Sequence, residues 1–144
     1  MFENVNIDSS VAVYVQIENH VQFAIASGVL KAGDRLPSVR ELSERLALNP
    51  NTVAKSYRDL EVMGYVYTRR GMGVFIKKGI EAKCREQCRK RIIGRLHEVV
   101  GESKAAGMTQ KAIKDVVGAS YAAEAGPYSA PPASVSALAK SKGA

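Results

Sequence analysis

The chain has 144 residues, 46% of them hydrophobic, and a formal net charge of +7. This length allows one compact domain and a small appendage. No apolar run is long enough to span a membrane, and the residues after Met1 lack the basic and apolar regions of a signal peptide. We therefore expect a cytoplasmic protein with no membrane partner.

The positive charge is concentrated in one part of the chain. Residues 31–95 carry 16 Lys and Arg against 7 Asp and Glu, a balance of +9, whereas the rest carries 5 against 7, a balance of −2. A uniformly solvated surface would spread its charges, so this concentration predicts a polyanionic partner such as double-stranded DNA. A membrane surface fits less well, because no amphipathic helix combines a basic face with Trp or Phe anchors.

The first predicted helix begins at Ser9 or Ser10, after a short lead-in, and runs to about Ser27. Its apolar residues recur at helical spacing, and Gly28 supplies a C-terminal stop. The apolar stripe consists of Tyr14, Ile17, Val21, Ala24 and Ile25.

Residues 38–63 are predicted to form two short helices, each with its own start signal. Ser38 followed by Glu41 is a capping box, in which the hydroxyl accepts from the N3 amide and the carboxylate returns to the N-cap amide. Asn49 is a second N-cap, with Pro50 at the first helical position, where a missing N–H costs nothing. Two helices joined by so tight a corner predict a helix-turn-helix.

The second of these helices sorts its residues into two faces. At about 100° per residue, the apolar Val53, Tyr57 and Leu60 fall on one side. The other side carries amides, a hydroxyl and cations, the groups that read base edges and phosphates in a major groove. These polar residues are Asn51, Thr52, Lys55 and Arg58. The alternative interpretation is an ordinary solvated helix face.

A β-hairpin is expected at about 65–77. Its two arms are rich in β-branched and aromatic residues. Gly71 and Gly73 between them can take the positive φ values of a tight turn, and Arg69 and Arg70 lie at the tip. A basic hairpin directly after a recognition helix predicts a wing that reaches the minor groove or the flanking backbone. The alternative is a charged tip that only favours solubility.

These motifs together resemble the winged helix-turn-helix of the GntR family of transcription regulators. The resemblance lies in residues 32–42, 49–53 and 69–73. The short chain is similar to the YtrA-like subfamily. The likeness is strong over 10–78, thinner over the tail helices and absent beyond about 122, and Ala12 stands where the family has a proline.

The resemblance implies roles for individual residues. Arg40 matches a family arginine that contacts a guanine, the commonest specific base contact of a guanidinium, and an exposed arginine is the alternative. Arg35 and Ser38 match family positions that touch DNA, although Ser38 also serves as a cap. The predicted DNA-binding set is Arg35, Ser38, Arg40, Asn51, Thr52, Lys55, Arg58, Arg69, Arg70 and Gly71.

Two further helices are expected over 79–122. Gly101 and Gly107 bracket a break between them, and Thr109 is the N-cap of the second. Two helices of this size cannot enclose a core, so they must pack against the winged domain or a second copy. We expect a homodimer, with interface residues Cys84, Cys88, Ile92, Leu96, Val100 and Ile113.

Catalysis and metal binding have no support in the sequence. Cys84 and Cys88 are the only cysteines, spaced four apart, so no zinc ribbon or closed metal site is indicated. They are expected to act as small hydrophobes, with a thiol redox switch as the alternative. The Gly-x-Gly at 71–73 belongs to a hairpin turn, and no pattern of catalytic residues or cofactor fingerprint is present.

The sequence therefore predicts a mainly α fold. It comprises a winged helix-turn-helix of three helices and a β-hairpin at 1–78, a two-helix dimerisation element at 79–122 and a disordered tail at 123–144. We expect a sequence-specific transcription regulator, a repressor that binds a palindromic operator as a homodimer, without cofactor or enzymatic activity.

The family resemblance adds a transporter operon as the target class. The alternative functions are a non-specific architectural or assembly module and a thiol redox-sensing regulator. No effector can be named from the sequence, and any small ligand is expected between the tail helices and the winged domain.

Overall fold

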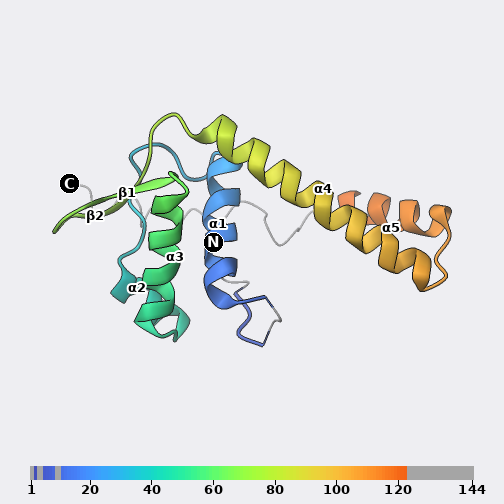
Figure 1. The fold of residues 1–144 in the computed structure, drawn as a ribbon, viewed down its shortest axis with the longest axis horizontal. Helices are drawn as coiled ribbons and strands as arrows, with labels where there is room; N and C mark the ends of the chain where they lie inside the picture. The colour runs from blue at the N-terminus through green and yellow to red at the C-terminus, as the bar shows by residue number, and fades with distance from the viewer. Residues whose placement is uncertain (1, 3–4, 9–10, 123–144) are drawn as a thin grey trace.

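The computed structural model describes residues 2, 5–8 and 11–122, so the tail expected to be disordered at 123–144 lies outside the described residues. Within them, the helices are α1 (Val13–Ala26), α2 (Val39–Leu46), α3 (Pro50–Val62), α4 (Glu81–Ala105) and α5 (Gln110–Ala122). The strands β1 (Val66–Arg69) and β2 (Gly73–Ile76) form an antiparallel hairpin between α3 and α4 (Figure 1). The predicted mainly helical winged helix-turn-helix is confirmed.

The core lies where α3 packs against both α1 and α2. Each helix contributes side chains with less than 2% of their surface exposed, which are Ile17, Val21, Ile25, Leu42, Val53 and Leu60. Burying such a side chain contributes about 1.5–3 kcal/mol relative to leaving it in water. The apolar face predicted for the second helix of the motif is therefore the face that holds the domain together.

A third extended segment, residues 33–36, runs along the free edge of the wing. Its residue Arg35 forms a bridge with Phe75 of β2, and the amide of Leu36 donates to the carbonyl of Val74 at 2.9 Å. On the inner face of the wing, Val66 and Ile76 are buried in the core. The chain that enters α2 is thus tied to the wing by backbone hydrogen bonds.

The first half of α4 belongs to the core of the winged domain. It packs against α1, and Cys84 and Cys88 are 0% and 3% exposed. The thiol of Cys84 donates to the carbonyl of Gln22 at 3.1 Å, and Nη1 of Arg91 donates to Oε1 of the same glutamine at 3.0 Å. The outer half of α4 then extends away from the domain (Figure 1).

This packing corrects the sequence-based interface. Cys84 and Cys88 were expected at a dimer contact, but α1 of the same chain already covers them. Their predicted behaviour as small hydrophobes fits this burial. The first half of α4 is therefore packed with the winged domain, while its outer half is exposed.

The break between the tail helices is shorter than expected. α4 continues through Gly101 to Ala105, since a single glycine costs a helix interior only about 1 kcal/mol. The turn itself uses Gly107, whose φ is +83°. The predicted N-cap is confirmed, because the amide of Ala112 donates to Oγ1 of Thr109 at 3.1 Å.

Apolar side chains on the outer half of α4 and on α5 are exposed in the protomer. Leu96 is 52% exposed and Tyr121 is 93% exposed, while Ile113 is half-buried. The other exposed apolar residues of this surface are Ile92, Ile93, Val99, Val100, Met108, Val116 and Val117. So many apolar side chains on one pair of helices are typical of an interaction surface.

Candidate nucleic-acid interface

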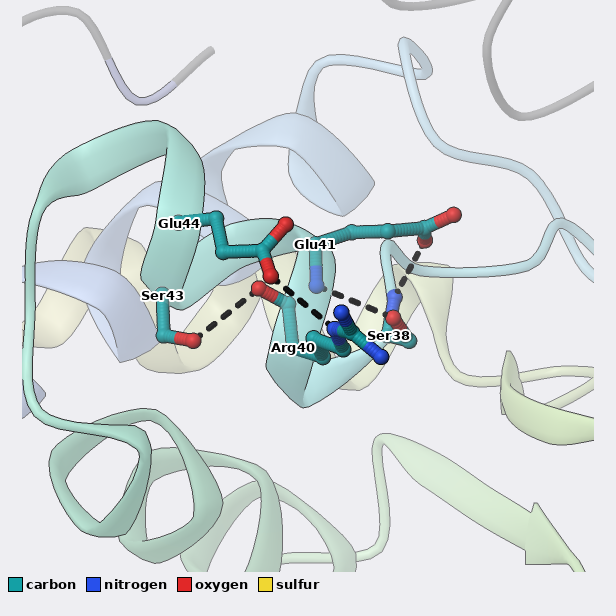
Figure 2. Close-up of polar contacts among 5 residues, drawn as sticks. All are labelled: Ser38, Arg40, Glu41, Ser43 and Glu44. Atoms are coloured by element: carbon teal, nitrogen blue, oxygen red, sulfur yellow. Dashed lines mark hydrogen bonds and ion pairs between the residues drawn. The ribbon is translucent and has the colours of Figure 1, made fainter.

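The capping box at the start of α2 is confirmed (Figure 2). The amide of Glu41 donates to Oγ of Ser38 at 3.1 Å, and the amide of Ser38 donates to Oε2 of Glu41 at 2.8 Å. Removing such a cap costs about 1 kcal/mol. Ser38 therefore already has a structural task, and a contact with DNA would be a second one.

Arg40 is the second residue of α2, and its side chain is 87% exposed. Its Nε donates to Oε1 of Glu44 at 2.9 Å, one helical turn further along (Figure 2). This hydrogen bond and the charge of Glu44 raise the pKa of Arg40. The interaction uses Nε and leaves the terminal nitrogens of a fully charged guanidinium outside the helix.

The start of α3 also follows the prediction. The amide of Asn51 donates to Oδ1 of Asn49 at 2.9 Å, and Pro50 takes the first helical position. Asn51 is exposed and Thr52 is half-buried, and Arg58 is exposed further along the helix. These polar groups stay on the surface while the opposite face is buried.

A hydrogen bond connects the second helix of the motif to the segment that enters the first. The hydroxyl of Tyr57, on the buried face of α3, donates to the carbonyl of Pro37 at 2.7 Å. Pro37 directly precedes the cap of α2. Tyr57 is therefore both a core residue and a spacer that holds the start of α2 against α3.

Lys55 lies at the edge of α3 that faces α1. Its Nζ is 2.9 Å from Oδ2 of Asp59 and 4.4 Å from the centre of the Tyr14 ring. The hydrogen bond to Asp59 is the main reason why the pKa of Lys55 is raised. In the protein without DNA, this ammonium thus points toward α1, and it would have to leave Asp59 to reach a phosphate.

The tip of the wing carries three of the predicted residues. Arg69, Arg70 and Gly71 are all exposed. The amide of Met72 donates to the carbonyl of Arg69 at 3.0 Å, which closes the turn, and Gly71 has the positive φ, +76°, that this turn requires. The closed turn thus places two cationic side chains at the tip of the hairpin.

Arg35 is placed differently from an ordinary surface arginine. It is half-buried, and its Nε is buried without a hydrogen-bond partner among the described residues. This Nε lies beside Gly73, where an added Cβ atom would be 2.7 Å from it. The side chain of Arg35 therefore lies over Gly73 of β2.

The sequence did not identify three residues that shape this surface. Glu44 engages Arg40, and the spacing of four residues on a helix could have shown it. Tyr14 lies under Lys55, but only the packing of α1 on α3 brings these two residues together. Gly73 was assigned to the turn, and its contact with Arg35 depends on the edge pairing of residues 33–36.

Other kinds of site are not seen in the part of the chain that the structure describes. No helix there is both long and apolar enough to cross a membrane. No group of three or more His, Cys, Asp or Glu side chains in residues 2, 5–8 and 11–122 could hold a metal ion.

Comparison with known proteins agrees with the winged helix. Residues 13–76 match the family described as bacterial regulatory proteins, gntR family. The HTH-type transcriptional repressor YtrA of Bacillus subtilis is 36% identical over 100 residues, which are 69% of this chain and 77% of that protein.

Solved structures extend the similarity to the tail helices. A transcriptional regulator from Oenococcus oeni has a TM-score of 0.59 at 34% identity, covering 81% of this chain and 97% of the other. A GntR family regulator from Listeria monocytogenes has a TM-score of 0.61 at 33% identity, covering 77% and 96%. This family consists of DNA-binding transcription regulators, not of enzymes. The chain, with its capped helix-turn-helix and basic wing, belongs to the GntR family and is YtrA-like.

Proposed function

We propose that this regulator is a cytoplasmic, sequence-specific repressor that binds a palindromic operator as a homodimer. The observation that carries the proposal is the exposure, on one helix-turn-helix, of groups suited to base edges and phosphates. Arg40 on α2 and Asn51 and Arg58 on α3 are all exposed and come from helices with confirmed caps. The basic wing adds Arg69 and Arg70.

Each group has a contact for which its chemistry is suited. The terminal nitrogens of Arg40 can form a bidentate pair with O6 and N7 of a guanine, and the amide of Asn51 can pair with an adenine. Arg58 and Lys55 are assigned to phosphates, which position the protein without reading sequence. Arg69 and Arg70 are assigned to the minor groove or the backbone beside it.

The homodimer is supported by the apolar surface of α4 and α5. One protomer presents one recognition helix, whereas two related by a two-fold axis present two helices to half-sites about one helical turn, roughly 34 Å, apart. A second copy would cover exposed side chains such as Leu96 and Val100. Ile92 also lines an open groove of about 800 Å³ between α1 and α4, so the apolar surface continues to the winged domain.

The target class rests on the subfamily resemblance. The Bacillus subtilis relative is described as a repressor, and repression by occupying an operator needs no more than tight binding. We extend to this chain the control of a transporter operon that is typical of YtrA-like regulators.

A binding titration tests sequence specificity. Promoter fragments from the neighbourhood of the gene are compared with random duplex of equal length at one salt concentration, because affinity depends strongly on salt. We expect one fragment to bind about 10³-fold or more tightly than random duplex, with footprinting that shows an inverted repeat. Equal affinities for all duplexes would favour the alternative of a non-specific architectural protein.

A further inference from the structure

The outer face of the wing carries a row of side chains that the recognition helices do not include. Arg35 is paired with Phe75, Phe75 is paired with Tyr67, and Arg69 is paired with Gly73. Directly paired residues of antiparallel strands share one face, as do residues two apart on a strand. Since Val66 and Ile76 occupy the buried face, these five residues share the outer one.

Within this row, a pair of stacked aromatic rings lies next to a glycine that leaves a gap on the face. The rings of Tyr67 and Phe75 stack with their centres 5.7 Å apart and their planes 23° apart. Two residues along β2, Gly73 has no side chain, and its φ is +125°. A Cβ atom there would lie 2.7 Å from Nε of Arg35 and 3.5 Å from both Cδ and Cζ. No real Cβ approaches another atom so closely, so the arginine occupies the place of the missing side chain.

The guanidinium is held in this gap by packing and not by a hydrogen bond. Nε of Arg35 is buried and has no partner among the described residues. A buried polar group without a partner is uncommon and calls for a reason. Only Nε of this guanidinium is a buried donor without a partner, which leaves the two terminal nitrogens as the donors to consider for a ligand.

We propose that Gly73 positions Arg35, so that the terminal nitrogens of this arginine bind a DNA backbone phosphate beside the wing. The proposal rests on the proposed function and deepens it. The backbone at residues 33–36 is already bonded to β2, and the side chain of Arg35 adds a second contact with the same strand, at Gly73. Because Ser38, the cap of α2, is three residues away, the wing and the start of α2 are held to the DNA as one unit.

A thermodynamic cycle tests the gap without any DNA. The free energy of unfolding is measured in urea for wild type, Arg35→Ala, Gly73→Ala and the double variant. The unfavourable φ of an alanine at residue 73 is present in both backgrounds and cancels in the cycle. We expect Gly73→Ala to destabilise the wild-type protein more than it destabilises the Arg35→Ala protein. Additive effects would overturn the assignment of the gap to Arg35.

Gly79→Ala provides the matched control for the cycle. Gly79 also has a positive φ, +76°, but a Cβ atom there would meet no atom within 4 Å. Its effect is expected to be the same with and without the Arg35 side chain.

The phosphate contact is tested by the salt dependence of binding to a random 30-base-pair duplex. The logarithm of the binding constant falls with the logarithm of the salt concentration, and each lost phosphate contact makes this negative slope less steep by about 0.9. We expect Arg35→Gln and Gly73→Ala each to make the slope less steep by the amount of about one phosphate contact per protomer. Arg35→Lys keeps the charge and should keep the wild-type slope. The Gly73→Ala/Arg35→Ala double variant is expected to lose no more phosphate contacts, measured by the same slope, than either single variant.

The two readouts separate the possible failures. A coupled cycle with an unchanged salt slope in Arg35→Gln would show that Arg35 only supports the wing, and would overturn the DNA contact. A wild-type protein that binds no duplex would overturn the proposed function itself, while the unfolding cycle would still decide the role of Gly73.

Discussion

In the free protein, Nε of Arg40 donates a hydrogen bond to Oε1 of Glu44 at 2.9 Å, although both side chains lie on the surface. An exposed pair of this kind contributes little to stability, because water screens its charges. Its main effect is orientation. The carboxylate holds the guanidinium by its Nε edge and leaves the terminal edge for a ligand.

Arg40→Ala is expected to weaken operator binding by about 1–3 kcal/mol and to relax the preference at one base pair in each half-site. The loss of a bidentate base contact is the cause. Affinities for an operator and its single-base variants, measured by fluorescence anisotropy, check the result. Lys55→Ala is the comparison, because the loss of a phosphate contact weakens binding evenly across sequences.

Glu44→Gln gives a second comparison for the same residue. It keeps the shape of the side chain and removes a negative charge that competes with DNA for Arg40. Operator affinity should rise without a change in base preference. If Arg40→Ala discriminated between bases as well as the wild type does, Arg40 would not be a base-reading residue.

Glu18 is expected to make stability depend on pH. Burial, and next the hydrogen bond and charge of Asp59, raise the pKa of Glu18 from 4.5 to about 7. Lys55 and Arg91 act in the opposite direction. Because the folded chain binds the proton more tightly than the unfolded chain, the free energy of unfolding should fall as the pH rises from about 4.5 to 7.

Glu18→Gln should remove this dependence and stabilise the protein at pH 8. Urea denaturation at pH 5, 6, 7 and 8 provides the measurement. The pKa of Asp59 is lowered, mainly by its hydrogen bond to Lys55, so its own contribution to stability is lost only at pH values below this range. Glu86→Gln, at an exposed carboxylate paired with Lys90, is the control that should keep the wild-type slope.

The thiols should be unreactive in the native protein. Burial is the main cause that raises the pKa of Cys84 to about 12, and the thiolate is the reactive form. A disulfide-exchange reagent at pH 8 should modify both cysteines only as fast as the protein unfolds. Joint replacement by alanine should cost about 1–3 kcal/mol of stability and leave operator binding intact. Rapid modification, with binding that changes in parallel, would favour the redox alternative.

Truncation should separate folding from assembly. A fragment that ends after residue 78 loses Ile80, Cys84 and Cys88 from the core and should be markedly destabilised. A fragment that ends after residue 94 keeps them, together with Arg91, and should be folded but monomeric, with weak operator binding. Light scattering and circular dichroism on both fragments test this. A dimeric fragment 1–94 would place the interface on the winged domain.

The parts of the fold that depend on local signals were predictable from the sequence. Two helix starts are specified locally, because each cap is formed within four residues. The capping residues are Ser38 with Glu41 and Asn49 with Pro50. The wing was equally local, since Gly71 and two flanking arms are enough to specify a hairpin.

The parts that depend on distant contacts were not predictable in the same way. The stripe that includes Cys84 and Cys88 indicates a buried face, but it cannot say whether α1 or another molecule covers that face. Glu18 lies one residue from Ile17 of the predicted apolar stripe, and nothing local shows that a carboxylate there is buried against Asp59. The family resemblance points to Arg35, whereas its position over Gly73 depends on the pairing of residues 33–36 with β2.

The unbroken course of α4 gives the proposed dimer a fixed helical phase. The same 25-residue helix is anchored in the winged domain at Cys84 and carries the exposed Leu96 and Val100 beyond it. One residue inserted at Gly94 would therefore turn the outer half by about 100° and shift it by about 1.5 Å relative to the recognition helix. The number of residues in α4 would then determine the relative orientation of the two half-sites that one dimer can bind.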